Sequence, residues 1–120
     1  DIVSWGYVTE EKKLELMSRS WALLFPSIRE GWGIPITEAG CVGTPSIVFD
    51  SPGIRDAVDY GKAGYLCLQN TAEGLAEQMR NVISDKASYE NVRESACRFS
   101  SRFLWDIAGN DFGAFIDFLA

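Results

Sequence analysis

Short apolar stretches alternate with helix-type segments along this chain, and this alternation constrains the fold more than any other feature. Four stretches are typical of strands, at residues 2–8, 21–25, 46–49 and 65–68. Helical connections of the length found between them join parallel strands. We therefore expect an α/β fold with a Rossmann-like parallel sheet of about four strands, flanked by helices. Such a sheet binds ligands at the carboxyl ends of its strands.

Residues with known capping roles mark several of the expected helix ends. Thr9 is an N-cap candidate for the first helix, and Pro35 suits the first position of the second. Asn70, followed three residues later by Glu73, resembles a capping box. Two later helices have apolar residues spaced along one face: Leu75, Met79, Val82 and Ile83 in one, and Tyr89, Val92, Ala96 and Phe99 in the other.

The composition argues against several classes of function. The formal net charge is −6, which disfavours nucleic acid as a partner because phosphates are bound by clustered Lys and Arg. The chain contains no histidine, which removes Ser-His-Asp and Cys-His nucleophile systems and His-based metal sites. No apolar run of about 18 residues occurs, so no transmembrane segment is expected. Three cysteines without paired spacing indicate free thiols in a reducing compartment.

The segment from Phe25 to Ala39 carries most of the chemical information. It follows a predicted buried strand and opens a helix, so we expect it at the ligand edge of the sheet. Gly31 and Gly33 permit a positive φ or a close approach of the backbone. The free N–H groups and the dipole at the helix start favour an anion, and a diphosphate fits that position.

Two glutamates, Glu30 and Glu38, border the same expected crevice. Carboxylates beside an anion site repel phosphate, so hydroxyl groups are their natural partners, and one carboxylate can accept from both hydroxyls of a diol. A sugar at one glutamate, a ribose at the other and a diphosphate between them is the arrangement of a nucleotide sugar. Other interpretations stay open: Glu38 as a helix-start residue, Glu30 as a solvated loop charge and Trp32 as a buried aromatic.

Residues 30–39, EGWGIPITEA, resemble the Glu-x7-Glu motif of retaining glycosyltransferases with the GT-B fold, the family named glycosyl transferases group 1. Trp32 stands where that family usually has an aromatic residue. The similarity covers about residues 5–108. The flanking segments that share it are residues 6–8, 43–45, 52–58, 61–66 and 103–108.

The resemblance implies a role for each residue of the segment. Glu30 would be the catalytic-site residue that contacts hydroxyls of the transferred sugar, and Glu38 would bind the ribose hydroxyls. The backbone of residues 31–34 would contact the sugar and the distal phosphate. Thr37 would reach the diphosphate through its hydroxyl or its N–H. The expected substrate-binding residues are Glu30, Gly31, Trp32, Gly33, Ile34, Thr37 and Glu38.

The resemblance also implies an enzyme that transfers a hexosyl group from a nucleotide sugar to a glycan, lipid or other hydroxyl acceptor, with retention of configuration. The turn at residues 52–56 is reminiscent of mannosyltransferases. No cofactor and no metal would be needed. The family's basic Arg and Lys stretch is missing here, as is the N-terminal acceptor domain. Residues 1–120 are therefore expected to be a partial C-terminal nucleotide-sugar-binding domain, inactive alone.

Further expectations follow for pathway, location and partners. The resemblance points to polysaccharide or glycolipid biosynthesis in the cytoplasm, with a peripheral membrane location of the full-length protein left open. An apolar stripe near the C-terminus either drives self-association or packs on the domain's own sheet. Its members are Phe112, Phe115, Ile116 and Leu119. Two alternative functions stay open: a nucleotide-sugar epimerase of the same fold, and a non-catalytic nucleotide-sugar-binding module.

Overall fold

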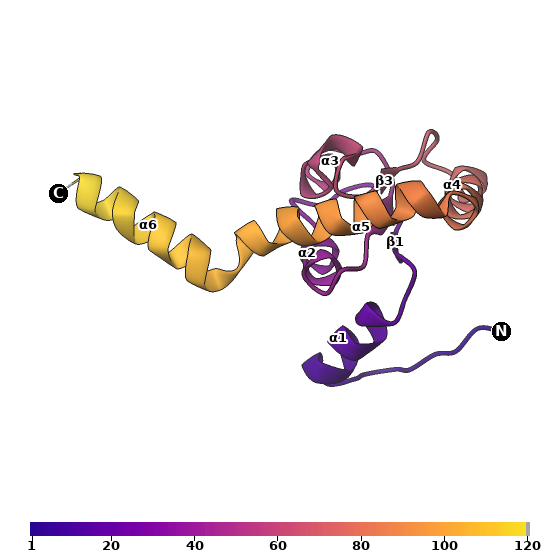
Figure 1. The fold of residues 1–120 in the computed structure, drawn as a ribbon, viewed down its shortest axis with the longest axis horizontal. Coiled ribbons are helices and arrows are strands. Elements are labelled where there is room, and N and C mark those ends of the chain that lie inside the picture. Colours follow the sequence, from indigo (N-terminus) through magenta and orange to yellow (C-terminus); the bar gives the residue numbers. More distant parts are fainter. Residues whose placement is uncertain (120) are drawn as a thin grey trace.

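Three parallel strands form the sheet at the centre of the protein (Figure 1). The computed structural model describes residues 1–119, apart from the side-chain surroundings at residues 105, 112, 113 and 119. The strands are β1 (Leu23–Phe25), β2 (Ser46–Val48) and β3 (Tyr65–Leu66), in the order β1-β2-β3. In the register, Leu24 pairs with Ile47, and Val48 pairs with Leu66. The expected α/β class with a parallel sheet is confirmed.

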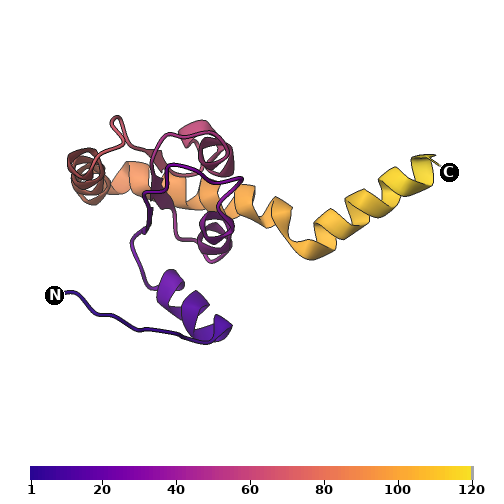
Figure 2. The same cartoon turned by 180° about the vertical axis from the view of Figure 1, so that it is seen from behind.

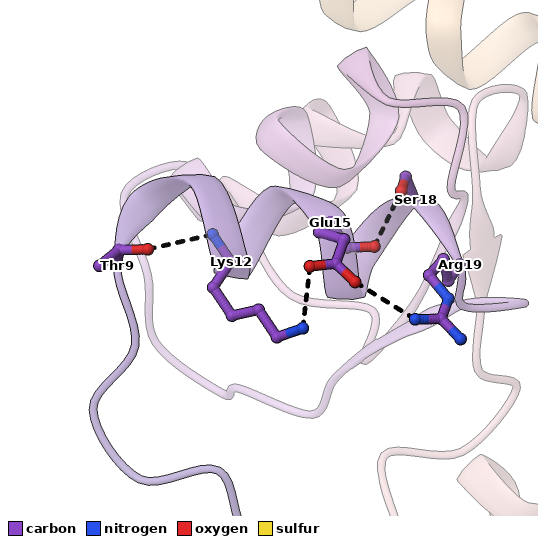
Figure 3. A network of polar contacts seen from close by, with 5 residues as sticks. All are labelled: Thr9, Lys12, Glu15, Ser18 and Arg19. Carbon is purple, nitrogen blue, oxygen red and sulfur yellow. Dashed lines mark hydrogen bonds and ion pairs between the residues drawn. The ribbon is translucent and has the colours of Figure 1, made fainter.

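Along the chain, helices lie between the strands, and further helices come after the last strand. They are α1 (Glu10–Ser18), α2 (Ile34–Cys41), α3 (Ile54–Ala57), α4 (Ala72–Ser84), α5 (Lys86–Ser100) and α6 (Trp105–Leu119), with single 3₁₀ turns at Asp59–Gly61 and Ser101–Phe103. Figure 3 shows the predicted cap of α1, where the Thr9 hydroxyl oxygen accepts from the backbone N–H of Lys12. Pro35 lies in the first turn of α2, one position later than predicted, because the helix begins at Ile34.

Alternate residues of a strand point to opposite faces of the sheet. Helices pack on both faces. On one face, Val48 packs with Ile36 of α2 and with apolar residues of the α3 region. On the other face, Ile47 packs with Val82 of α4 and Tyr89 of α5. All three residues of β2 are buried, which agrees with its place between two neighbours. The sheet and these four helices form the core that holds the loops described below.

The predicted strand at residues 2–8 does not form. Figures 1 and 2 show this segment running outside the body of the protein beside α1, and Ile2 and Tyr7 are fully exposed, at 100%. A strand needs a neighbour to pair its backbone groups, and among the described residues none lies beside this segment. β1 is therefore an edge strand. Leu24 remains 39% exposed, so the expected burial of this strand on both faces is also wrong.

The predicted capping box at the start of α4 is wrong by one residue. The N-cap is Thr71, whose hydroxyl oxygen accepts from the N–H of Gly74 at 3.1 Å. Asn70 instead bonds to the backbone of Asp50, 20 residues earlier. A tertiary partner therefore competes successfully with the local cap. Along α4, Val82 is buried and Leu75 partly buried, whereas Ile83 is 60% exposed.

The last helix, α6, extends away from the body of the protein, which gives the molecule its elongated outline of 54 × 31 × 29 Å (Figure 1). Phe115 and Ile116 of the predicted stripe are 54% and 47% exposed. The side chains of Phe112 and Leu119 lie outside the described residues.

Among the residues that the structure describes, no helix is both long enough and apolar enough to cross a membrane.

Candidate functional site

Three loops meet at the carboxyl edge of the sheet, because each one follows a parallel strand. The loop after β1 is bonded to the loop after β2 through the Ser51 hydroxyl, which lies 3.4 Å from the carbonyl oxygen of Ser27. The loop after β2 is bonded to the one after β3, since Asn70 Oδ1 accepts from the Asp50 N–H at 2.8 Å and Asn70 Nδ2 donates to the Asp50 carbonyl at 3.0 Å. These hydrogen bonds hold the three loops against one another at the carboxyl edge of the sheet.

A close backbone contact fixes the predicted segment against its neighbour. Gly53 has a φ of +82°, and a Cβ atom there would collide with the carbonyl oxygens of Glu30 and Gly31. Only glycine permits this approach without a shift of the backbone. Pro52, beside it, lines an open hollow together with the loop residues Ile28, Arg29, Glu30 and Gly31. The turn at Pro52 and Gly53 therefore supports the loop that carries Glu30.

The start of α2 presents free backbone donors. Gly33 is the N-cap, with a left-handed backbone at φ +82°. Pro35 has no N–H, and the N–H of Ile36 donates to the Gly33 carbonyl at 2.9 Å. Within the described part of the chain, the N–H groups of Gly33 and Ile34 have no hydrogen-bond acceptor. Such groups at a helix start attract an anion.

Glu30 lies in this loop with its side chain exposed. Its only polar contact among the described residues is a long one, from the Ser27 hydroxyl to Glu30 Oε1 at 3.4 Å. The carboxylate therefore has free acceptor capacity toward the hollow. Nearby, Arg55 is held in an ion pair with Asp50 at 2.7 Å, which neutralises that cation. A solvated loop charge and a sugar contact both remain compatible with this position of Glu30.

Glu38 lies one turn inside α2, and its side chain is 30% exposed. The Lys13 ammonium of α1 donates to Glu38 Oε1 at 3.0 Å, and the same ammonium pairs with Glu10 Oε2 at 2.6 Å. Hydrogen bonds first to Glu10 and then to Glu38 raise the pKa of Lys13 above its usual value. The lysine is therefore a full cation at neutral pH. Sequence reasoning missed this pair because the two residues are 25 positions apart.

Two other predicted residues face inward. The Trp32 ring is partly buried against the core cluster that includes Ile36 of α2, and its centroid lies 4.8 Å from that of Phe103. Of the two interpretations open for this residue, this geometry favours the packed aromatic. Thr37 is 8% exposed, and its hydroxyl donates to the Ile34 carbonyl at 2.9 Å. That proton is therefore engaged inside the helix.

The described residues hold no group of three or more His, Cys, Asp or Glu side chains arranged to bind a metal ion. Cys41, Cys67 and Cys97 are free thiols, and of these Cys67 is buried. Burial raises the pKa of the Cys67 thiol, which keeps it protonated at neutral pH. Cys67 therefore offers no thiolate nucleophile at neutral pH.

Comparison with known proteins identifies the family. The model of the family described as glycosyl transferases group 1 matches residues 2–99, which include all three strands and the whole Glu30 to Glu38 segment. The chain belongs to this family. The resemblance found in the sequence is thereby confirmed at the level of the family.

Relatives of this chain include proteins with different names. A glycogen synthase of Mycobacterium tuberculosis is 32% identical over 101 residues, covering 83% of this chain and 24% of that protein. A D-inositol 3-phosphate glycosyltransferase of Jonesia denitrificans is 31% identical over 86 residues, covering 72% and 20%. An N-acetyl-alpha-D-glucosaminyl L-malate synthase of Bacillus anthracis is 30% identical over 87 residues, covering 72% and 23%. The matched region thus spans about a quarter or less of the curated relatives.

Proposed function

We propose that this chain is the donor-binding part of a retaining glycosyltransferase that uses a nucleotide-diphosphate sugar. One observation carries the proposal. Glu30 and Glu38 flank a helix start at the carboxyl edge of a parallel sheet, and the N–H groups of Gly33 and Ile34 between them have no acceptor among the described residues. The two carboxylates can accept hydrogen bonds from hydroxyl groups, and the N–H groups between them can donate to phosphate.

Each glutamate takes one part of the donor. Glu30, exposed beside the hollow, accepts hydrogen bonds from hydroxyls of the transferred sugar. Glu38 accepts from the ribose, because its Oε2 has no hydrogen-bond partner among the described residues. The amides of Gly33 and Ile34 face the diphosphate. Trp32 packs against Phe103 and the core, so its ring supports the loop and does not contact the donor.

The chemical step needs no nucleophile from this chain. In a retaining transfer without a covalent intermediate, the acceptor hydroxyl attacks from the face that the diphosphate leaves, and the diphosphate takes the hydroxyl proton. The protein orients the sugar and stabilises the charge that develops on the leaving group. Here Glu30 orients the sugar, and the helix start contributes to stabilising the diphosphate.

The transferred group is proposed to be a hexose, with mannose suggested by the turn at residues 52–56. The relatives' names include a glycogen synthase and an inositol phosphate glycosyltransferase, which supports a glycan, lipid or other hydroxyl acceptor. The acceptor would be bound by a further domain, so residues 1–120 alone are expected to transfer no sugar.

The test is sugar transfer by the intact protein that carries this segment. Glu30→Ala and Glu38→Ala should each lower kcat/KM about 10- to 100-fold, because each removes hydrogen bonds to a charged acceptor. Glu73→Ala, at an exposed position in the first turn of α4, is the matched control and should leave transfer unchanged. Full transfer by both variants would refute the assignment of the two glutamates.

Product analysis separates this proposal from the alternatives. Mass and anomer analysis should give a glycoside with the anomeric configuration of the donor. An epimerised nucleotide sugar would instead identify an epimerase, and donor binding without any product would identify a binding module.

A further inference from the structure

The Lys13 side chain is the only ionic link between α1 and the rest of the described protein. Its ammonium lies between Glu38 Oε1 of α2, at 3.0 Å, and Glu10 Oε2 of its own helix, at 2.6 Å. Both Lys13 and Glu38 are 30% exposed, which places the pair at the boundary between the body of the protein and solvent.

The packing around Lys13 aims its ammonium at α2. Lys13 lines an apolar cleft between α1 and β1, together with residues that include Leu16 and Leu23. A lysine whose methylene groups lie along apolar side chains extends its charged end in a defined direction. Here that direction leads to Glu38. The neighbouring Lys12 is directed differently: it pairs with Glu15 within α1 at 2.8 Å (Figure 3).

The position of α1 depends on few contacts. None of its residues is buried. At its C-terminal end, the Thr44 hydroxyl donates to the Met17 carbonyl at 2.6 Å. At its N-terminal half, Lys13 supplies the polar link to α2. Glu38 and α1 therefore fix each other's positions.

The lysine also changes what Glu38 presents to a ligand. With Oε1 occupied, Oε2 keeps its acceptor capacity, so the direction of the carboxylate is defined before any ligand arrives. The positive charge offsets the repulsion between this carboxylate and an anion at the α2 start. A glutamate without such a partner would lose side-chain freedom on binding, which weakens affinity.

We propose that Lys13 is a positioning residue for the nucleotide: it holds the Glu38 carboxylate in the direction that accepts the ribose hydroxyls. This inference rests on the proposed function of Glu38. Lys13 acts through Glu38 and does not itself contact the donor. Loss of Lys13 should therefore lower affinity only for ligands whose ribose hydroxyls donate to Glu38.

The experiment compares a nucleotide with its 2′,3′-dideoxy form. NMR titration of the chain, which detects weak binding, first selects the tightest of UDP, GDP and ADP. Lys13→Met removes the charge and keeps the apolar stem. It should weaken binding of the ribonucleotide by roughly 3- to 10-fold. Binding of the dideoxy nucleotide should stay unchanged, and Lys13→Arg should restore part of the ribonucleotide affinity.

Controls assign each outcome. Lys12→Met is the control, because its lysine pairs with Glu15 of α1 and lies 5.1 Å from the Trp5 ring centroid, away from Glu38. It should bind both nucleotides as the unaltered chain does. Thermal unfolding reports whether Lys13→Met has disturbed the fold. Equal weakening of both nucleotides, or of neither, by Lys13→Met would overturn the inference. Glu38→Ala tests the proposed function separately: it should weaken binding of the ribonucleotide and leave binding of the dideoxy nucleotide unchanged. Equal weakening of both nucleotides, or of neither, by Glu38→Ala would refute the role of Glu38 itself.

Discussion

At Gly33 the backbone adopts a left-handed conformation, at φ +82°, immediately before α2 begins. A Cβ atom at this position would lie 2.8 Å from Ile36 Cδ1 and 3.2 Å from the Phe25 ring. Glycine is thus required for two reasons: the backbone has a positive φ, and a Cβ atom would have too little space. This residue sets the direction in which α2 leaves the loop, and with it the position of Glu38.

Gly33→Ala should lower the free energy of unfolding by about 1–3 kcal/mol, because the strained backbone and the close contact add together. Denaturant unfolding followed by circular dichroism measures this change. Gly31→Ala is the control in the same loop: a Cβ atom there meets nothing within 4 Å, and its φ is not positive. An equal loss of stability in both variants would show that the Gly33 conformation is not the cause.

Tyr65 has an unusual environment for a phenol. Its hydroxyl is buried and has no hydrogen-bond partner among the described residues. Burial first, and then the charges of Tyr89 and Asp85, raise the pKa of Tyr65 from 10.0 to about 12. The folded protein therefore disfavours the ionised phenol. The corresponding stability is fully present below pH 10 and is lost as the pH rises from 10 toward 12.

Tyr65→Phe should leave the free energy of unfolding at pH 7 unchanged or raise it by about 1 kcal/mol, because it removes a buried hydroxyl without a partner. The variant should also lose less stability than the unaltered chain between pH 10 and 12. Unfolding measured at pH 7 and pH 11 checks both statements. A clear loss of stability at pH 7 would mean that the hydroxyl does have a partner.

Among the elements, the loops after β2 and β3 are joined by one side chain. Asn70 makes two hydrogen bonds to the backbone of Asp50, and these hold the two loops together at the ligand edge. Asn70→Ala should lower the free energy of unfolding by about 1–2 kcal/mol, as expected for two lost bonds at an exposed site. Asn70→Asp keeps the acceptor but loses the donor. Its free energy of unfolding, measured with denaturant, should lie between those of the unaltered chain and Asn70→Ala.

Thr71→Ala separates the effect of the Asn70 bonds from that of the α4 cap. If Asn70→Ala were neutral while Thr71→Ala cost about 1 kcal/mol, only the helix cap would matter at this junction.

How well the sequence predicted each element depends on where its partners lie. The prediction of the Thr9 cap is confirmed, and the predicted helix start at Pro35 is right to within one residue, because both signals lie within one helical turn. The strand at residues 2–8 was wrong because no neighbouring strand pairs with it among the described residues. Asn70 was misassigned because its partner, Asp50, comes from another loop.

The same distinction holds for the candidate site. The spacing of Glu30 and Glu38 was enough to place both near a helix start at the ligand edge of the sheet. The ion pair of Glu38 with Lys13 could not be predicted from that spacing, because the helices α1 and α2 meet only in the folded protein. The same is true of the contact between Trp32 and Phe103.

For the whole molecule, the projecting helix α6 is the feature with a consequence for assembly. Its exposed apolar residues include Phe115, at 54%, and Phe118, at 84%. Apolar faces of this kind favour association. We expect the chain to self-associate through α6, with an apparent mass that rises with concentration in analytical ultracentrifugation.

A single charge on that face should prevent the association. Phe115→Asp is expected to keep the chain monomeric over the same concentrations. Leu68→Asp is the matched control, because Leu68 is also exposed, at 87%, but lies on the body of the protein. A monomeric unaltered chain, or equal disruption by both variants, would refute association through α6.

We propose that Glu30, the α2 start and Glu38 together form one donor-binding edge. Its most direct test is an NMR titration of the chain with UDP, GDP and ADP, following every backbone amide. We expect saturable shifts centred on residues 33–38, with further shifts at residues 30–31, and loss of these shifts in Glu38→Ala. Shifts confined to another part of the sheet or to α6, or no shifts with any of the three nucleotides, would contradict it.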